Sequence, residues 1–432
     1  MTRIYATATL KHLLQRRRLN PIIERWNLEQ QKTEQCFQLL RQLVNIPQGI
    51  VVDAEESPLV NHLIENYLVQ ADAVSPKDLG LPFVFVEAIN FELTYGCNLA
   101  CAHCLQDALR PQGFHWISQE AVIRALKDGQ WLGLTTLGVN FTGGEIFMPG
   151  SPVLGLLAVA RDLGIPARAN TNAWWGGRTQ ITIGTHTFAD DEAVVEALIQ
   201  QQLGRLALSL DNRYQQYPSL LDRVVQVATL CEAAQLSYEF VATDPSPEVV
   251  YLAWDKLTQR IGCQPCYLMM TPMEKVDVGA PARDNQGTLK AKTLVELAVK
   301  SPCKTYGFYR PYFLHVAPHG GIRSCMQAPN GSWLGNIMQQ RLPEILNRAS
   351  QSPVYRLFKD EGLAAFCDRY LTPWQHLYRN VTHGCTASAL LARLAEEIHR
   401  QEASLCRPLA TKELEALHQR IGKEYHLLQP TT

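Results

Sequence analysis

Residues 83–104 have the sequence FVFVEAINFELTYGCNLACAHC, in which an apolar segment is followed by a cluster of cysteines. Phe83–Leu93 is a strand candidate that leads directly into a loop with three cysteines. A helical pattern follows at Ser118–Leu132, and the next strand candidate, Thr135–Phe141, ends at Thr142-Gly143-Gly144-Glu145. The stretch therefore opens a repeating order of strand, loop and helix.

The same order continues to about residue 285. Strands that alternate with helical patterns favour parallel βαβ units, here about six of them. In such sheets and barrels, functional residues collect in the loops after the carboxyl ends of the strands. We therefore predict an α/β fold, with a partial (β/α)6 TIM-like barrel over residues 83–285. Further strand candidates are Ala167–Asn170, Leu206–Leu210, Ser237–Ala242 and Cys266–Met270, and further helices are Val153–Leu163, Asp191–Gln201 and Leu220–Ala234.

Regions on either side of the barrel differ from it in pattern. Residues 1–82 are predicted to form a separate helical N-terminal domain, with a helical pattern over Ile22–Val44. Ser57-Pro58 fits the N-cap and first turn of a second helix. Over residues 286–432 the regular alternation is lost, and we predict a small C-terminal α+β domain followed by helices.

The composition excludes several classes of protein. The 432 residues are 46% hydrophobic and 19% charged, which is enough for a large core and two or three domains. With 40 Lys+Arg and 41 Asp+Glu, the net charge of −1 gives no overall attraction to nucleic acid or anionic membranes. No apolar run is long enough to span a membrane, and the N-terminus lacks the apolar region of a secretory signal. We expect a soluble, cytoplasmic protein.

Cysteine is unusually frequent, with twelve in the chain. A reducing compartment disfavours structural disulfides, so grouped cysteines indicate a metal site. Cys97, Cys101 and Cys104 have the spacing C-x3-C-x2-C. Three thiolates on one short loop can bind three corners of an iron–sulfur cube and leave one position for another group, with a structural zinc site as the alternative. Three other cysteines lie in helix-like segments and are predicted to pack as small apolar side chains: Cys36, Cys231 and Cys406.

The triplet and the loops after the following strands together resemble the radical S-adenosylmethionine (SAM) enzymes. His103 matches the aromatic position of the family's cysteine motif, beside the adenine. Gly143-Gly144-Glu145 resembles the amino-group-binding element one strand later. Asn170-Thr171-Asn172 and Ser209-Leu210-Asp211 resemble the family's strand-end residues, for which ordinary turn chemistry is the alternative. The match covers roughly residues 85–275, and the motifs follow one another along the chain in the same order as in the family.

This resemblance implies a [4Fe–4S] cluster held by Cys97, Cys101 and Cys104. Its open iron would be chelated by the amino and carboxylate groups of SAM. One electron would then cleave SAM to methionine and a 5′-deoxyadenosyl radical, which abstracts hydrogen from the substrate. A barrel interior would supply the closed, water-poor cavity that this chemistry needs. The cofactor-binding residues implied are His103, Gly143, Gly144, Glu145, Asn170, Ser209 and Asp211, with Glu145 as the candidate partner of the SAM ammonium.

The C-terminal region resembles the SPASM/twitch extensions of radical SAM enzymes, which hold auxiliary iron–sulfur clusters. Gly320 to Cys325 has the spacing G-x4-C, and Leu334-Gly335-Asn336-Ile337 follows it. The dense cysteine run of a full SPASM domain is missing, so the resemblance favours a shorter, twitch-like domain. We predict one auxiliary cluster with four ligands, Cys303, Cys325, Cys367 and Cys385. For Cys367 the alternative is a buried thiol that packs in the core.

Cys263 and Cys266 form a C-x2-C pair near the last predicted strand. They could contribute cluster ligands or a redox pair. Alternatively, Cys266 could point into the cavity and donate a hydrogen atom to a substrate radical, which makes both thiols catalytic candidates. The remaining alternative is that they are core thiols beside Tyr267–Met270.

These observations predict a radical SAM enzyme that acts on a ribosomally synthesised precursor peptide, by cross-linking, epimerisation or backbone excision. SPASM/twitch domains are common among peptide maturases, and the additional domain at residues 1–82 could bind a leader peptide, although a pattern of three strands and a helix is not evident there. Expected partners are a reductant such as flavodoxin or ferredoxin and a separate leader-peptide-binding protein. The alternatives are a radical SAM dehydrogenase or rearrangement enzyme on a small metabolite, and a non-enzymatic metal-binding module.

Overall fold

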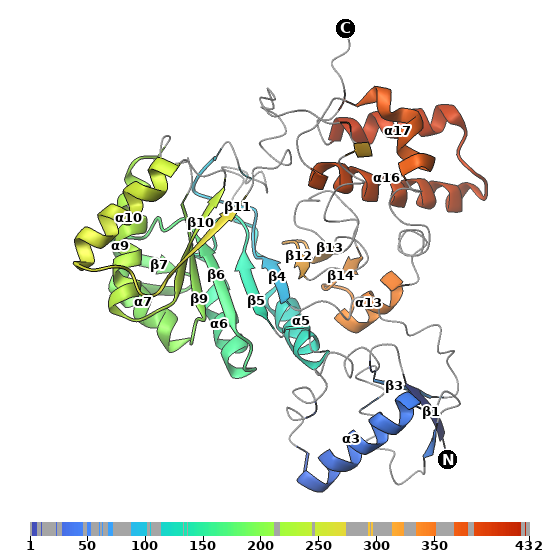
Figure 1. Ribbon diagram of the computed structural model, residues 1–432, viewed down its shortest axis with the longest axis horizontal. Coiled ribbons are helices and arrows are strands. Elements are labelled where there is room, and N and C mark those ends of the chain that lie inside the picture. Colours follow the sequence, from blue (N-terminus) through green and yellow to red (C-terminus); the bar gives the residue numbers. More distant parts are fainter. Residues whose placement is uncertain are drawn as a thin grey trace.

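The computed structural model describes most of the chain, in segments separated by gaps. The described segments are residues 2–6, 28–45, 50–52, 68–71, 88–101, 114–132, 134–135, 137–210, 217–243, 247–273, 313–323, 334–350, 367–378 and 384–424, with single or paired positions at 10, 23, 60, 63, 104, 293, 295–296 and 428. Three bodies are visible in Figure 1, and each has its own cluster of buried apolar side chains.

A nine-stranded sheet forms the central body of the described chain, in the order β11-β10-β9-β6-β5-β4-β12-β13-β14. Neighbouring strands from β11 to β12 are parallel, and β13 and β14 are added antiparallel. This confirms the predicted α/β class with a partial (β/α)6 barrel, because β4, β5, β6, β9, β10 and β11 are neighbours in chain order and parallel. The bounds are β4 Ala88–Glu92, β5 Gly138–Thr142, β6 Ala167–Thr171, β9 Arg205–Ser209, β10 Tyr238–Thr243, β11 Leu268–Met273, β12 Phe313–Val316, β13 Gly321–Arg323 and β14 Gly335–Asn336.

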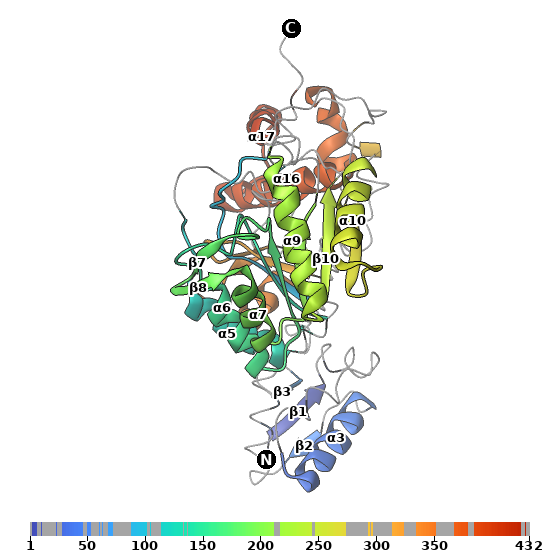
Figure 2. The same cartoon turned by 90° about the vertical axis from the view of Figure 1, so that its left-hand side faces the viewer.

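Helices cover one face of this sheet (Figures 1 and 2). Apolar strand residues such as Phe91, Phe141 and Leu208 are buried against them in one continuous cluster. Ser118 caps the first of these helices by accepting from the backbone N–H of Ala121 at 3.2 Å. The helices are α5 Gln119–Trp131, α6 Val153–Asp162, α7 Asp191–Gln200, α9 Ser219–Ala233 and α10 Pro247–Ile261, and a hairpin of β7 Thr179–Ile183 and β8 His186–Asp190, which was not predicted, precedes α7.

The other face of the sheet is polar. Alternate residues of a strand point to the same face, and register partners align them in rows across the sheet. Asn170, Ala207 and Glu239 belong to one such row. The row nearer the amino ends of the strands contains three arginines, and its members in order are Arg323, His315, Asn90, Asn140, Arg168 and Arg205.

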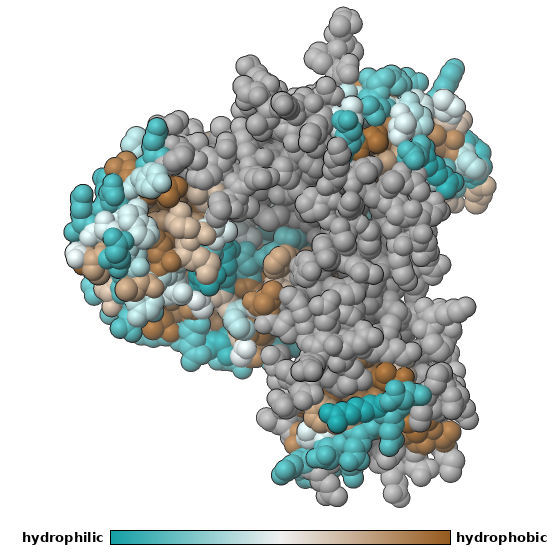
Figure 3. All heavy atoms as spheres, in the orientation of Figure 1, coloured by the Kyte–Doolittle hydropathy of each residue, from teal (hydrophilic) through white to brown (hydrophobic). Residues whose placement is uncertain are grey.

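The N-terminal body combines a small sheet with a helix. Strands β1 Thr2–Ala6, β2 Ile50–Val52 and β3 Val69–Ala71 form an antiparallel sheet in the order β2-β1-β3. Helix α3, Gln30–Asn45, buries Cys36, Leu40 and Leu43 in a cluster with Ile4. The predicted helical domain is therefore right for α3 but incomplete, because three short strands accompany it. The outer face of α3 is polar and forms the hydrophilic surface of this body in Figure 3.

The C-terminal residues form two different structures. Strands β12 to β14 extend the central sheet beside β4, and helix α13, Leu342–Ser350, packs next to them. A separate helical body follows, made of η3 Cys367–Leu371, η4 Thr372–Leu377, α16 Gly384–Leu405 and α17 Thr411–Glu424. Its apolar cluster includes Cys367, Leu394 and Ile421.

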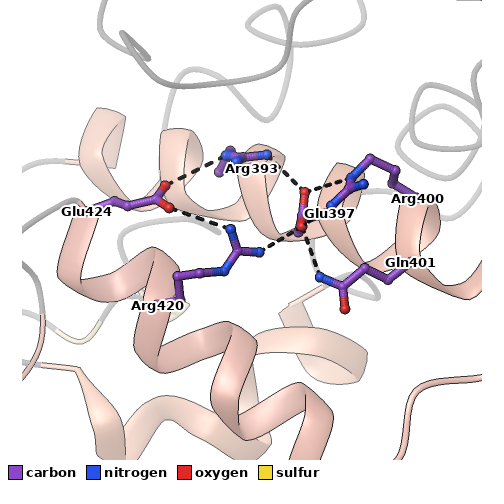
Figure 4. A network of polar contacts seen from close by, with 6 residues as sticks. All are labelled: Arg393, Glu397, Arg400, Gln401, Arg420 and Glu424. Atoms are coloured by element: carbon purple, nitrogen blue, oxygen red, sulfur yellow. Dashed lines mark hydrogen bonds and ion pairs between the residues drawn. The ribbon is translucent and has the colours of Figure 1, made fainter.

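A polar network joins α16 to α17 in that body (Figure 4). Glu397 is 3% exposed and accepts hydrogen bonds from Arg400, Gln401 and Arg420. Hydrogen bonding, first of all from Arg400, holds the pKa of the Glu397 carboxyl well below its usual range. A buried carboxylate with this many donors gives the two helices a fixed alignment.

None of the helices in the described segments has both the length and the apolar character needed to cross a bilayer.

Candidate functional site

The cysteine loop follows the carboxyl end of β4. Cys97, Cys101 and Cys104 are all half-buried in it. The backbone N–H of Leu99 donates to Sγ of Cys97 at 3.4 Å, and that of Cys104 donates to the carbonyl of Cys101 at 3.2 Å. Burial, together with the neighbouring Glu145, Cys101 and Cys104, raises the pKa of Cys97 to about 12. The three thiols therefore share one short loop, in which Cys97 is the most clearly shielded from water.

Two glycines allow the loop after β5 to lie against the start of the cysteine loop. The N–H of Gly144 donates to the carbonyl of Thr94 at 2.7 Å, and that of Glu145 donates to the carbonyl of Gly96 at 2.9 Å. A Cβ on Gly143 would overlap the Thr94 carbonyl oxygen, and a Cβ on Gly144 would overlap that of Gly96. Gly143 also has φ of +135°, which side chains other than glycine rarely adopt. The close approach of these two loops therefore requires glycine at both positions.

Glu145 connects three loops at this edge of the sheet. It is fully buried, and its Oε1 accepts from the N–H of Phe147 and the hydroxyl of Thr171, both at 2.9 Å. Its Oε2 accepts from the N–H of Asn172 at 2.7 Å. These donors hold the Glu145 carboxyl where the loops after β5 and β6 meet the cysteine loop.

Asn172, in the loop after β6, makes a contact with the cysteine loop that the sequence did not reveal. Its Nδ2 donates to Oδ1 of Asn98 at 2.8 Å and lies 3.9 Å from Sγ of Cys97. The sequence signal was only the position of Asn172 directly after a strand. The predicted neighbour Asn170 faces elsewhere, since its Oδ1 accepts from Arg168 at 2.6 Å.

The thiols fit an iron–sulfur cluster. Among the residues that the structure describes, no three His, Cys, Asp or Glu side chains converge closely enough to hold one metal ion. Thiolates of an iron–sulfur cube each bind a different iron atom, so their sulfurs need not converge on one point. Three half-buried thiols on a single loop can each serve a different iron atom.

Charged residues line the polar face of the sheet below this loop. Arg168 forms an ion pair with Glu239, and its Nη1 also donates to Oδ1 of Asn140 at 2.8 Å. Glu239, which is 2% exposed, accepts from the hydroxyl of Thr271 as well. These contacts cross the sheet from β5 to β11 and give its inner face several fixed hydrogen-bonding groups.

A second buried ion pair connects the C-terminal strands to the cysteine loop. Arg323 on β13 pairs with Glu92 at the end of β4, and both side chains are almost fully buried. Tyr95, two residues before Cys97, donates its hydroxyl to Oε2 of Glu92 at 3.0 Å. The position of β13 is therefore coupled to that of the loop.

The two thiols of the C-x2-C pair lie away from this edge. Cys263 and Cys266 are exposed, between the end of α10 and the start of β11. The cysteine loop follows the carboxyl end of β4. Because β11 runs parallel to β10 and the other strands, the amino end of β11 lies on the opposite side of the sheet, where the strands begin. The backbone N–H of Cys266 donates to Glu232 at 3.0 Å. The structure does not bring these predicted catalytic residues to the site.

The structure describes only some of the other predicted site residues. Ser209 ends β9, at the same edge of the sheet as Asn172. Cys367 is buried in the apolar cluster of the C-terminal helices, and burial raises its pKa to about 12. Cys385 lies in the first turn of α16, with its side chain outside the described part. Outside the described residues lie His103, Asp211, Cys303 and Cys325.

Known proteins give limited matches to this chain. No protein-family model matches it, and no curated protein sequence matches it significantly. Among solved structures, native anSMEcpe with bound AdoMet is similar over 74% of this chain and 98% of its own, with a TM-score of 0.40 and 12% identity. BtrN in complex with AdoMet and 2-DOIA is similar over 64% of this chain and 87% of its own, with a TM-score of 0.35 and 11% identity. The function proposed below rests on this chain's own residues.

Proposed function

We propose that this protein is a radical SAM enzyme whose catalytic cluster is held by Cys97, Cys101 and Cys104. The observation that carries the proposal is the loop with three neighbouring thiols at the carboxyl end of β4, fastened to Gly144 and Glu145 by backbone hydrogen bonds. When bound, a [4Fe–4S] cluster with an open iron supplies the electron that cleaves SAM and so generates the radical that abstracts hydrogen.

The protein's own residues bind and orient in this proposal. Glu145 places a buried carboxyl group beside the cysteine loop, which is the chemistry suited to hold the ammonium of SAM. Ser209, at the same edge, is a candidate polar contact for SAM. The sheet below the loop offers Arg168, Asn140 and Glu239 for a polar substrate.

The test is anaerobic reconstitution, measurement of iron and sulfide, and detection of 5′-deoxyadenosine by mass spectrometry after adding dithionite and SAM. We expect iron and sulfide in equal amounts and steady formation of 5′-deoxyadenosine. Formation of 5′-deoxyadenosine should be abolished by each of three substitutions: Cys97→Ala, Cys101→Ala and Cys104→Ala. A colourless protein with one zinc ion per chain and no 5′-deoxyadenosine would contradict the proposal and favour a non-enzymatic metal module.

As substrate we propose a ribosomally synthesised peptide. The N-terminal sheet supports this, because among the described strands β2 and β3 each pair only with β1 and leave their outer edges open. An extended peptide can bind such an edge as an additional strand. The exposed position of Cys266 at the opposite edge of the sheet favours cross-linking or backbone excision over an epimerisation that uses this thiol.

Co-expression with short peptides encoded beside the gene tests the substrate class. Mass spectrometry would show a loss of two hydrogens for cross-linking and a larger loss for excision. An unchanged mass in water, with one deuterium gained in heavy water, would indicate epimerisation. If no peptide changes while 5′-deoxyadenosine still forms, the small-metabolite alternative is favoured, for which the charged inner face around Arg168 is suited.

We also propose an auxiliary iron–sulfur cluster in the C-terminal region, with Cys303, Cys325 and Cys385 among its ligands. The support for it is the sequence pattern, in which Gly320 to Cys325 has the spacing G-x4-C. For Cys367, burial among apolar side chains favours packing. Cys325→Ala should lower the iron content while 5′-deoxyadenosine formation persists in part; an unchanged iron content would count against this second cluster.

A further inference from the structure

The side chain of Asn172 reaches from the loop after β6 to the cysteine loop. Its Nδ2 lies 2.8 Å from Oδ1 of Asn98 and 3.9 Å from Sγ of Cys97. An amide nitrogen has two hydrogens, so Asn172 has one for each of these atoms. Asn172 is 5% exposed, so little water competes for them.

The orientation of this amide is fixed by its neighbours. Oδ1 of Asn172 accepts from the N–H of Trp174 at 3.0 Å, so the amide oxygen and nitrogen cannot exchange places without losing that bond. The backbone N–H of Asn172 donates to Glu145 at 2.7 Å. The Trp174 indole in turn donates to the carbonyl of Phe147 at 3.0 Å. The Nδ2 hydrogens are thereby directed at the cysteine loop.

We propose that Asn172 is a positioning residue that raises the reduction potential of the cluster through the sulfur of Cys97. The inference rests on the proposed function, because it requires Cys97 as a ligand. The N–H of Leu99 already donates to this sulfur at 3.4 Å, and Asn172 adds a side-chain donor from another loop. Donors beside a ligand sulfur stabilise the negative charge gained on reduction, which makes reduction easier.

Two substitutions of Asn172 test the inference. Asn172→Leu keeps the size of the side chain and removes both N–H groups. Asn172→Asp keeps the oxygen that accepts from Trp174 and places a negative charge beside Cys97. The midpoint potential is measured by EPR-monitored titration of the reconstituted protein, and the SAM-binding cluster is identified by the change in its signal when SAM is added.

We expect both variants to keep the iron and sulfide content of the wild type and to have a lower midpoint potential. At a fixed potential, the ratio of reduced to oxidised cluster should fall about tenfold, which corresponds to about 59 mV for one electron. The fall should be larger for Asn172→Asp. Asn170→Leu is the matched control, because Asn170 lies in β6 two residues before Asn172 and contacts Arg168 instead of the thiol, so the potential of this variant should not change.

An unchanged potential in both fully loaded Asn172 variants overturns the inference. Loss of the cluster from both variants also overturns it, because Asn172 would then be needed for assembly and not for the potential. A wild-type protein that takes up no iron and sulfide would instead overturn the proposed function, so the two failures are distinguishable.

Discussion

Gly144 is the residue of the site with the least room for a side chain. Its N–H donates to the carbonyl of Thr94, and the space where a Cβ would lie is filled by the carbonyl of Gly96. Both groups belong to the segment directly before Cys97. A methyl group at this position would push the loop after β5 away from the cysteine loop.

Gly144→Ala is therefore expected to destabilise the protein by about 1–3 kcal/mol and to lower its cluster content. Urea unfolding and iron analysis measure the two effects. Gly155→Ala is the matched control, since a Cβ there meets only the end of the flexible Gln119 side chain and alanine favours helix α6. Equal effects of the two substitutions would contradict the assigned role of Gly144.

Sequence reasoning found the residues of the site whose spacing along the chain is informative. Cys97, Cys101 and Cys104 lie within one loop, and Gly143-Gly144-Glu145 follows a strand that was predicted correctly. It did not find the contact of Asn172 with Cys97, because this depends on how two loops from different strands meet. Cys266 precedes β11, so the structure places it at the opposite ends of the parallel strands from the cysteine loop.

At the level of elements, the contact of α17 with η4 depends on a buried histidine. His418 is fully buried, its Nδ1 lies 2.6 Å from the hydroxyl of Tyr378, and its ring stacks on Trp374. Burial lowers the pKa of His418 to about 4. In the folded protein this ring therefore stays neutral at pH values where the unfolded chain takes up a proton.

The stability of this helical body should consequently fall as the pH drops from about 6.5 towards 4. The unfolded state binds the extra proton in that range, and the loss approaches about 3 kcal/mol near pH 4. Urea midpoints at pH 7 and pH 5 measure it. His418→Phe keeps the stacking on Trp374 without a titratable group, so its midpoint should depend less on pH. The same pH dependence in both proteins would contradict this assignment.

The strands of the N-terminal body that sequence reasoning missed are short. Strand β2 has three residues and β1 five, with Ile4 as a fully buried residue of β1, so neither produces a clear alternating pattern. By contrast, most strands and helices of the central sheet recur in regular order, which made them predictable, although helix α10 was missed. The joining of β12 to β4 was not predictable, since it pairs His315 with Asn90 across a long stretch of chain.

On the scale of the whole molecule, a buried ion pair connects distant parts of the chain. Arg323 and Glu92 are 231 residues apart in sequence and are 1% and 0% exposed at their side chains. Tyr95 bonds to the same carboxylate, which brings β13, β4 and the cysteine loop together. Removing one partner would leave a buried charge without compensation.

Arg323→Met is therefore expected to cost about 3–5 kcal/mol of stability. Arg407→Met is the matched control, because the Arg407–Glu413 pair is exposed and its loss should lower the stability much less than loss of the buried pair. Urea unfolding measures both variants. A similar small loss for the two would show that the buried pair does not hold the C-terminal strands on the sheet.

The most direct measurement of the central claim is the EPR spectrum of the reduced, reconstituted protein with and without SAM. If Cys97, Cys101 and Cys104 hold a cluster with an open iron, adding SAM should change the spectrum in the wild type and have no such effect in Cys97→Ala. A reduced cluster whose spectrum is the same with and without SAM, or the absence of any cluster, would contradict the account.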